Sequence, residues 1–147
     1  MESFKFKYID IESPYYEKAV NLRTRLFFKD IKDSSELIND TFEITGLHLV
    51  CVKDDKVVGT GRLNIEHDKA IISQMAIDND YQKLGIGSKI VKEFILKSRR
   101  KGIKNIELSA RETALAFYKK FGFVGVDELY PSQKTGIIHQ NMELIIK

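Results

Sequence analysis

Two glycines separated by one residue, Gly85 and Gly87, are the first sign of chemistry in this sequence. They follow a polar stretch and stand at the beginning of an amphipathic helical pattern. At a helix start the first backbone N–H groups have no partner within the helix, and the helix dipole is positive there. Glycine lacks a Cβ, so it allows a positive φ and lets a ligand approach the backbone closely. The pattern therefore predicts an anion site of the kind that binds phosphate.

A strand, a turn and a helix must hold this loop in place. Ile71–Ile77 reads as a buried strand and Asp78–Asp80 as a polar turn, after which the loop Gln82–Gly87 opens into the helix. One face of the helix carries Ile86, Ile90, Val91, Phe94 and Ile95. The helix should therefore pack one side against a sheet, and Gly102 is expected to follow it as the C′ residue.

Alternating and helical apolar patterns predict the remaining elements. Strands are expected at residues 4–9, 47–53, 57–65, 103–110, 123–129 and 137–146, and helices at 14–28, 33–42 and 113–121. The first strand is expected at a sheet edge. Within the second strand of a hairpin, Gly59 and Gly61 indicate a bulge or the close approach of another element.

The order of these elements defines the fold class. Three strands joined by short turns form an antiparallel meander, and the strand, helix and strand that follow predict a parallel pair. The fold is therefore α+β or mixed α/β, with a central mixed sheet of six or seven strands and helices on both faces. With 147 residues, the chain is expected to form one domain over residues 1–147.

Composition narrows the class of protein and its partners. Apolar residues make up 43% and charged residues 31%, as in an ordinary globular protein, and no apolar run approaches the roughly 20 residues that span a bilayer. The N-terminus lacks an apolar signal region, so a cytoplasmic location is expected. A net charge of +3 helps to attract a small polyanion but does not argue for nucleic acid. The basic run Lys97–Lys104 complements a helix C-terminus.

Cysteine and histidine give no sign of a metal. Cys51 is the only cysteine, which excludes an intrachain disulfide, and it lies in an apolar run where a small buried hydrophobe is expected. His48, His67 and His139 have no ligand-like spacing. We therefore predict no metal site.

Spacing excludes two common phosphate-binding loops. A Walker A loop requires Gly-Lys-[Ser/Thr], whereas Gly87 is followed by Ser88 and then Lys89. A dinucleotide fingerprint requires a third glycine where Ile90 stands. Alone, a G-x-G string is weak evidence for phosphate binding and is better explained as a plain tight turn.

The longer string around these glycines resembles a known family. Gln82–Gly87 (QKLGIG) resembles the Q/R-x-x-G-x-G/A motif of the GNAT superfamily of acyl-CoA-dependent N-acetyltransferases, and it follows a strand that ends in Met75–Ile77, as the family requires. Ala114–Phe123 (ALAFYKKFGF) resembles the family's A-x-x-F/L-Y-x-K-x-G-F segment. Gly136–Met142 resembles the last strand, and Leu22–Phe27 the first helix, of one bacterial subgroup of small GNAT proteins.

The resemblance implies a GNAT-like fold and an activity. It implies transfer of an acetyl group from acetyl-CoA, the acyl-donor co-substrate, to a primary amine of a small molecule or peptide. The amine attacks directly, through a tetrahedral intermediate. In the family, backbone N–H groups of the loop bind the pyrophosphate and the preceding strand binds the pantetheine arm. The donor-binding residues implied here are Met75, Ala76, Ile77, Gln82, Lys83, Leu84, Gly85, Ile86, Gly87, Ser88, Phe117 and Tyr118.

Tyr118 occupies the family's general-acid position. A phenol with a pKa near ~10 can protonate a leaving thiolate whose thiol has a pKa of ~8.5. Backbone N–H groups near Met75–Ile77 would stabilise the oxyanion. Periodicity alone offers another interpretation, because Tyr118 lies on one apolar helical face with Ala114, Phe117 and Phe121 and would then be a core residue.

The general base is open. Some relatives carry a carboxylate on the strand before the loop, where this chain has Ile71 and Ile72. The candidates are an ordered water, Glu43, Glu66, Ser73, Glu107 and His139. A second departure is Arg111, which replaces an asparagine common in the family and leaves that residue's contact with coenzyme A open.

Two other functions remain as alternatives. One is a catalytically silent acyl-CoA-binding regulatory module, and the other is a nucleotide-binding oxidoreductase. The acceptor substrate is not encoded in any recognisable motif; Arg23, Glu36, Asp40 and Glu43 indicate a cationic amine only weakly. Dimers are common in the family, and the sequence leaves a homodimer open.

Overall fold

The structure, a computed structural model, describes residues 3–27, 40–133 and 135–147. Within these residues, seven strands form a mixed sheet in the order β1-β2-β3-β4-β5-β7-β6. The strands are β1 (Lys5–Ile9), β2 (Leu47–Lys53), β3 (Lys56–Glu66), β4 (Lys69–Ile77), β5 (Asn105–Arg111), β6 (Val124–Pro131) and β7 (Ile138–Ile145). The helices are α1 (Pro14–Phe27), α3 (Ile86–Arg100) and α4 (Leu115–Lys119), with short 3-10 turns at η1 (Asn79–Tyr81) and η2 (Glu112–Ala114). The predicted fold class is confirmed.

The chain divides into two compact units. The first unit comprises Met1–Asn64 and Gln74–Phe94, and the second comprises Ile65–Ser73 and Ile95–Lys147. Both β4 and α3 therefore contribute residues to each unit. That the whole chain is one domain over residues 1–147 stays a prediction.

The first unit is built on the antiparallel strands β1, β2 and β3. The turn between β2 and β3 consists of Asp54 and Asp55, with φ of +50° and +65°, as expected for a two-residue hairpin whose turn matches the strand twist. The register shifts by one residue between Cys51, which pairs with Gly59, and Val52, which pairs with Val57, so the extra residue of the bulge is Val58 of β3, next to Gly59. The hairpin, the irregularity near Gly59 and the edge position of β1 were all expected from the sequence.

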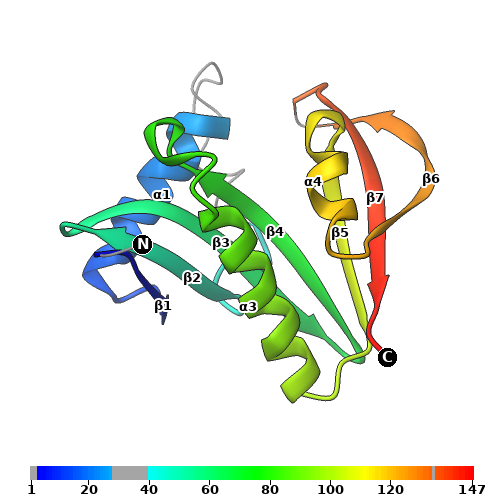
Figure 1. Cartoon of the computed structure of the whole chain (residues 1–147), viewed down its shortest axis with the longest axis horizontal. Coiled ribbons are helices and arrows are strands. Elements are labelled where there is room, and N and C mark those ends of the chain that lie inside the picture. Colours follow the sequence, from blue (N-terminus) through cyan, green and yellow to red (C-terminus); the bar gives the residue numbers. More distant parts are fainter. Residues whose placement is uncertain (1–2, 28–39, 134) are drawn as a thin grey trace. The chain divides into compact units, whose positions relative to one another are not determined.

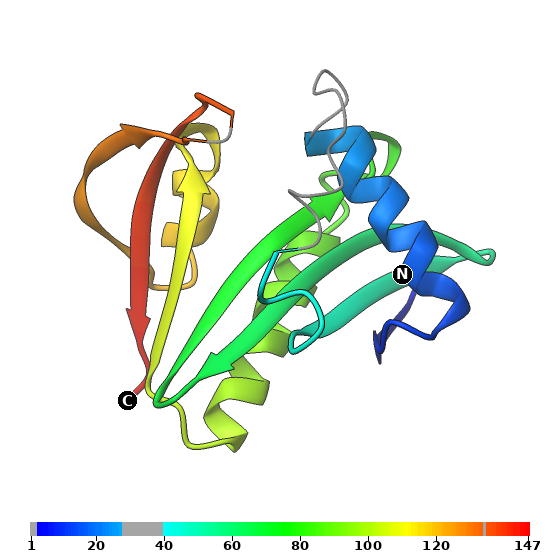
Figure 2. The ribbon, with the colours of Figure 1, turned by 180° about the vertical axis from the view of Figure 1, so that it is seen from behind.

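Helices cover both faces of this unit, as Figures 1 and 2 show from opposite sides. On one face, Ala19 and Leu22 of α1 pack against a cluster formed by Val50, Val52, Val57 and Ala76. On the other, α3 comes so close that a Cβ on Gly59 would lie 2.7 Å from Cγ2 of Ile86. A Cβ on Gly61 would lie 2.6 Å from Sδ of Met75. The two glycines therefore permit the close approach that their positions in a strand predicted.

The second unit joins β4 to β5, β7 and β6. Lys69–Ile72 of β4 pair in parallel with Asn105–Leu108 of β5, as predicted, and β5–β7 and β7–β6 are antiparallel. Gly102, with φ +75°, follows α3 as its C′ residue, and N–H of Ile103 donates to O of Ser98 at 2.9 Å. The predicted end of α3 is therefore confirmed.

The helix expected at 113–121 is a 3-10 turn, η2, followed by the short α4, because Ala114 has φ −105° and ψ 0° and interrupts the helical geometry between them. Gly122 follows with φ +100°. The helix expected at 33–42 falls mostly on residues outside the described ones. No helix in the described ranges is both long and apolar enough to cross a membrane.

Candidate functional site

The loop between β4 and α3 is fastened to the end of β4. The Asp78 carboxylate accepts a hydrogen bond from N–H of Asp80 at 3.0 Å, and N–H of Asp78 donates to O of Val58 at 2.8 Å. The Gln82 amide donates to O of Ile77 at 3.1 Å and to Oδ1 of Asn79 at 3.0 Å. Gln82, the first residue of the family motif, thus fixes the entry to the loop.

The backbone of the loop then turns into the left-handed region twice. Lys83 has φ +66° and Gly85 has φ +86°, with Leu84 between them. Alternation between left-handed and other conformations makes successive N–H groups converge into a concave anion site. Residues 82–85 are exposed, so the loop is accessible to a ligand from solvent.

The loop ends at the beginning of α3. N–H of Lys89 donates to O of Gly85 at 3.0 Å, which makes Gly85 the N-cap residue. The N–H groups of Ile86, Gly87 and Ser88 therefore have no partner within the helix. Their positions next to the left-handed turns make one continuous set of donors from Lys83 to Ser88, as an anion site requires.

The two glycines of the loop have different backbone conformations. Only Gly85 adopts the positive φ that glycine allows, because α3 begins at Ile86 and Gly87 lies within its first turn. Gly87 instead leaves its own backbone N–H, within the first turn of α3, without a side chain beside it.

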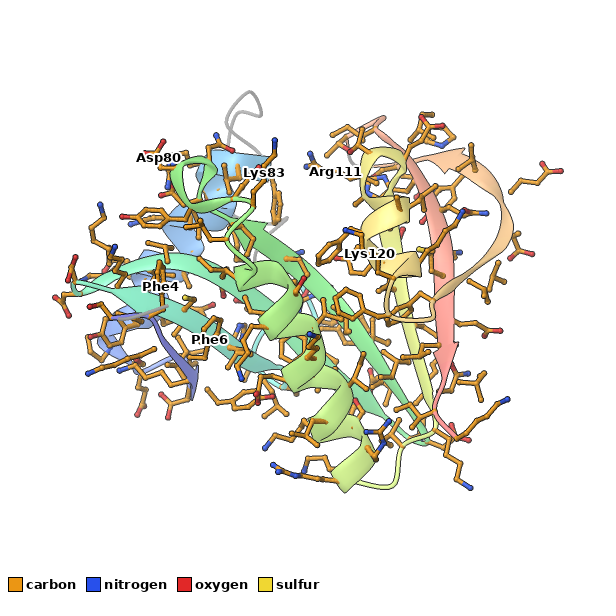
Figure 3. All side chains as sticks on the ribbon, viewed as in Figure 1. Phe4, Phe6, Asp80, Lys83, Arg111 and Lys120 are labelled. Carbon is orange, nitrogen blue, oxygen red and sulfur yellow. The ribbon has the colours of Figure 1, made fainter. Side chains whose placement is uncertain are left out.

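Lys83 adds a positive charge to the loop. Figure 3 shows Lys83 and Asp80 on the loop that precedes α3. Lys83 is exposed, and no carboxylate among the described residues lies within ion-pair distance of its ammonium group. By contrast, Asp78 is paired with Arg25 at 3.2 Å. The unpaired cation of the loop is therefore available to an anionic ligand.

The end of β4 supplies the other predicted contacts in the first unit. Ala76 is buried against α1, whereas Met75 and Ile77 are half-buried and their side chains lie close to Gly61 and Gly59. The residue before them, Gln74, has φ +56°, so the strand is kinked there. The structure thus brings Met75–Ile77 and the loop together in one unit.

Phe117 and Tyr118 lie together in the second unit, on α4. The Tyr118 ring packs edge-on against Phe117 and Phe123, with ring centroids 5.0 and 5.9 Å away, and the residue is 7% exposed. Burial raises the pKa of Tyr118 to about 12, so its hydroxyl is protonated at neutral pH. No described residue accepts a hydrogen bond from this hydroxyl. The ring of Tyr118 is thus packed in the core, and its hydroxyl remains a hydrogen-bond donor that no described residue uses.

Glu43 is not a suitable base. Its carboxylate receives hydrogen bonds from Arg23 at 2.7 and 2.9 Å, from Arg62 at 2.8 Å and from Tyr16 at 2.5 Å. Burial alone would raise the pKa of Glu43, but the hydrogen bonds from Arg23, Tyr16 and Arg62 lower it to about 2. A carboxylate this stabilised cannot take a proton from an amine. The charge of Glu43 is also fully compensated, which removes the indication of a cationic substrate there.

The other base candidates lie in the second unit. Glu107 is paired with Lys69 at 3.2 Å, and Glu66 and Ser73 are half-buried. Nδ1 of His139 lies 2.8 Å from O of Ile137, and because a carbonyl only accepts, Nδ1 carries the proton. Nε2 of the neutral ring is then the acceptor. Of these candidates, His139 alone has a side-chain acceptor fixed by its own hydrogen bond.

Arg111 ends β5, opposite His139 of β7. Figure 3 shows it at the end of β5 where the chain turns toward α4, in the second unit. The role of Arg111 toward coenzyme A, where the family commonly has an asparagine, stays open.

Cys51 is buried, and burial raises the pKa of its thiol to about 11, so it is a core residue and not a nucleophile. The described ranges contain no group of three or more His, Cys, Asp or Glu side chains that could hold a metal ion.

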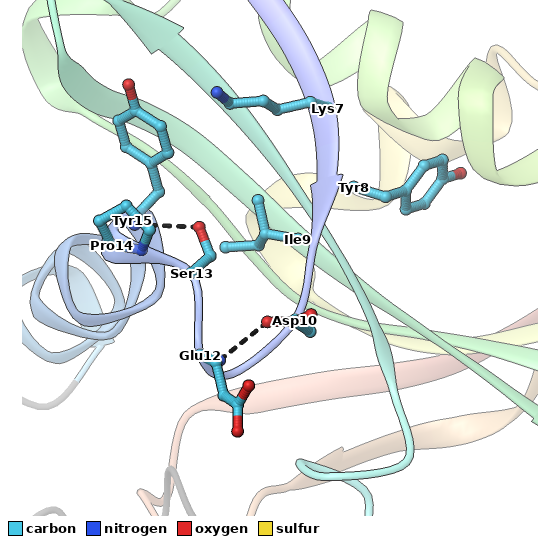
Figure 4. A pocket seen from close by; sticks show the side chains of 8 residues that line it. All are labelled: Lys7, Tyr8, Ile9, Asp10, Glu12, Ser13, Pro14 and Tyr15. Atoms are coloured by element: carbon cyan, nitrogen blue, oxygen red, sulfur yellow. Dashed lines mark hydrogen bonds between the residues drawn. The ribbon is translucent and has the colours of Figure 1, made fainter.

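A hollow of about 460 Å³ lies elsewhere in the first unit. Figure 4 shows its lining at the connection between β1 and α1, where Asp10 accepts from N–H of Glu12 and Ser13 accepts from N–H of Tyr15. None of its lining residues belongs to β4, α3 or the loop between them. The hollow is therefore not the predicted donor site.

Sequence reasoning missed the buried network around Glu43. Arg62 and His48 are 3% and 2% exposed, and Nε2 of His48 donates to O of Glu43 at 2.8 Å. The only signal was a charged residue, Arg62, in the middle of an apolar strand. Gln74 carried no signal at all.

Comparisons with known proteins identify the family. A model of the acetyltransferase (GNAT) domain matches residues 45–125, more than half of the chain. The protein therefore belongs to the GNAT acetyltransferase family.

Individual relatives agree with this assignment. The uncharacterized protein YyaT of Bacillus subtilis is 28% identical over 120 residues, which cover 80% of each chain. The crystal structure of Escherichia coli ElaA has a TM-score of 0.81 and 18% identity, covering 96% of this chain and 99% of that one. A GNAT family acetyltransferase from Elizabethkingia anophelis with acetyl-CoA bound has a TM-score of 0.75 and 17% identity, covering 99% and 100%. At these identities the two solved structures show a common fold.

Proposed function

We propose that this protein is an N-acetyltransferase that transfers an acetyl group from acetyl-CoA to a primary amine of a small molecule or peptide. The observation that carries the proposal is the left-handed turn at Lys83 and Gly85, which converges exposed N–H groups at the start of the 15-residue helix α3. Membership of the GNAT family and a neighbour with acetyl-CoA bound support the choice of anion.

The donor is held by the first unit. N–H groups from Lys83 to Ser88 bind the pyrophosphate, and the Lys83 ammonium adds a charge–charge contact. The backbone of Met75 and Ile77 binds the pantetheine arm, and N–H groups of the same segment stabilise the oxyanion of the tetrahedral intermediate. The amine attacks the thioester carbonyl carbon, and the sulfur leaves.

Tyr118 assists the departure of the sulfur. Because its pKa is about 12, it is a weaker acid by roughly 3.5 pK units than a thiol at ~8.5, and complete transfer of its proton to the thiolate is uphill. Donation of a hydrogen bond to the developing negative charge is the favourable contribution. The amine proton passes to water or to one of the remaining base candidates, of which His139 has an acceptor, Nε2, with a fixed tautomer.

Two measurements test the proposal. Acetyl-CoA should raise the melting temperature, and NAD should not; stabilisation by NAD alone would favour a nucleotide-binding oxidoreductase. Release of free coenzyme A thiol over a broad panel of amines should then show turnover. Binding without turnover on that panel would leave the silent acyl-CoA-binding regulatory module. A homodimer and a cytoplasmic location stay predictions.

The loop itself provides a specific prediction. Gly85→Val should raise the KM for acetyl-CoA about tenfold, because a β-branched residue must be forced into the left-handed region, at a cost of about 1–2 kcal/mol, each time the donor binds. Steady-state kinetics with varied acetyl-CoA measures this change.

Gly102→Val is the matched control. Gly102 also has a positive φ, +75°, and a Cβ there would have no neighbour within 4 Å. The control should lower the free energy of unfolding by the same left-handed strain, about 1–2 kcal/mol, and should leave the KM for acetyl-CoA unchanged. Equal KM values in the two variants would show that the Gly85 turn does not bind the donor.

A further inference from the structure

A network of buried charges lies beneath the end of β4 in the first unit. The side chains of Arg23, Glu43 and Arg62 are 1%, 3% and 4% exposed. Arg23 binds both carboxylate oxygens of Glu43, and Arg62 binds Glu43 and also Asp40, at 2.9 and 3.0 Å. Since a buried carboxylate between two guanidinium groups has little freedom, the plane of the Arg23 guanidinium is fixed.

The third donor of Arg23 extends this network to β4. Nε of Arg23 donates to Oε1 of Gln74 at 3.1 Å. Gln74 is the β4 residue with a left-handed backbone, φ +56°, which is uncommon for a residue other than glycine. Such a conformation persists only where the surroundings hold it. The hydrogen bond from a fixed guanidinium to this side chain is a specific restraint on the kink.

The kink lies directly before the segment that the proposed function assigns to the acyl arm. Sδ of Met75 approaches Gly61 and Phe94 on the α3 face, whereas Gln74 is bound by a residue of α1. The backbone orientation at Gln74 therefore decides in which direction the N–H groups of Met75–Ile77 point.

We propose that Arg23 and Gln74 are positioning residues, which hold the β4 kink so that the Met75–Ile77 backbone is presented to the pantetheine thioester. The inference rests on the proposed function. It adds that the buried pair of Arg23 and Glu43 has a role in donor binding beyond its role in stability. A purely structural network would not need its third hydrogen bond at the one left-handed residue of β4.

Binding of two ligands separates these roles. Acetyl-CoA contacts both the loop and the end of β4, whereas 3′-phospho-ADP, the pyrophosphate-bearing half of coenzyme A, lacks the pantetheine arm. Gln74→Ala should weaken acetyl-CoA about tenfold in titration calorimetry and change the affinity for 3′-phospho-ADP less than twofold. Gln74→Glu keeps an acceptor oxygen for Arg23 and should restore the wild-type affinity for acetyl-CoA.

Two further variants control for misfolding and for the loss of a hydrogen bond from the buried network. Gln74→Gly adopts a positive φ freely and should fold even where Gln74→Ala does not, and it too should lose acetyl-CoA affinity selectively. Tyr16→Phe removes a single hydrogen bond from the same Glu43 carboxylate without touching Gln74, so it should lower stability and leave both affinities unchanged.

The outcomes distinguish this inference from the proposed function. If the wild-type protein binds no acetyl-CoA, the proposed function fails and the inference fails with it. If the wild-type protein binds acetyl-CoA but the Gln74 variants weaken both ligands equally, or neither, the inference alone is overturned. Selective loss with rescue by Gln74→Glu supports it.

Discussion

Tyr118→Phe is expected to lower kcat about 100-fold and to leave the KM for acetyl-CoA nearly unchanged. Proton donation in the transition state contributes about 10²–10⁴-fold. The lower end applies here because burial raises the pKa of Tyr118 to about 12, which weakens it as an acid while leaving it a hydrogen-bond donor. The ring, which packs against Phe117 and Phe123, is kept by phenylalanine, so the fold should be kept too. Thiol release under saturating donor measures the change.

The pH dependence of kcat provides a second test of the role of Tyr118. A phenol whose pKa is about 12 keeps its proton throughout the range from pH 7 to 10. The wild-type kcat should therefore show no loss through Tyr118 in that range, and activity should fall on this account only as the pH approaches 12. A limb below pH 10 that disappears in Tyr118→Phe would contradict the assignment.

Tyr15→Phe is the control for the lost hydroxyl. Tyr15 donates to the exposed carboxylate of Asp55 at 2.7 Å and belongs to neither the loop nor α4. Its kcat should equal that of the wild type. A Tyr118→Phe variant as active as Tyr15→Phe would show that Tyr118 is a core residue only.

Glu43→Gln is expected to cost about 3–5 kcal/mol in the free energy of unfolding at pH 7, because it leaves the buried guanidinium group of Arg23 without its counter-charge and removes one of the carboxylates, beside Asp40, that pair with Arg62. Urea unfolding followed by circular dichroism measures this loss. Asp55→Asn is the control, since Asp55 is exposed and its contacts with Lys18 and Tyr15 lie at the surface. Its unfolding midpoint should be almost unchanged.

Acid provides an independent check on Glu43. Its pKa in the folded state, about 2, lies below the ordinary value of 4.5. The stabilisation from Glu43 is therefore complete above about pH 4.5 and is lost as the pH falls toward 2. Between pH 5 and 3 the wild-type protein should lose more stability than Glu43→Gln. Parallel losses in the two proteins would mean that the carboxylate is not held in its charged form.

Local sequence signals were sufficient for most of the architecture. Alternating residues predicted the β2–β3 hairpin, and Gly102 predicted the end of α3, because both depend on neighbours close in sequence. The boundaries around α4 were less well predicted, since a 3-10 turn and an α-helix share one apolar pattern over so few residues.

The candidate site likewise combines features that the local sequence predicted with features that only the tertiary structure shows. Gly85 and the string around it predicted the anion loop before any tertiary contact was known, whereas the helical φ of Gly87 follows from where α3 begins. The pKa of Tyr118 required knowledge of its burial. Its position in the motif did not show how deeply the ring is packed.

By itself, then, the sequence determined the family and the order of most elements and predicted the donor loop, because these depend on local patterns and on a short motif. Only the tertiary structure decided that Glu43 is a buried counter-ion and not a base. Arg23 and Arg62 are separated from Glu43 by 20 and 19 residues, and Gln74 is 51 residues from Arg23. Side chains so far apart in the chain meet only when α1, β3 and β4 pack together, and it is that packing which sets their charge states and the kink of β4.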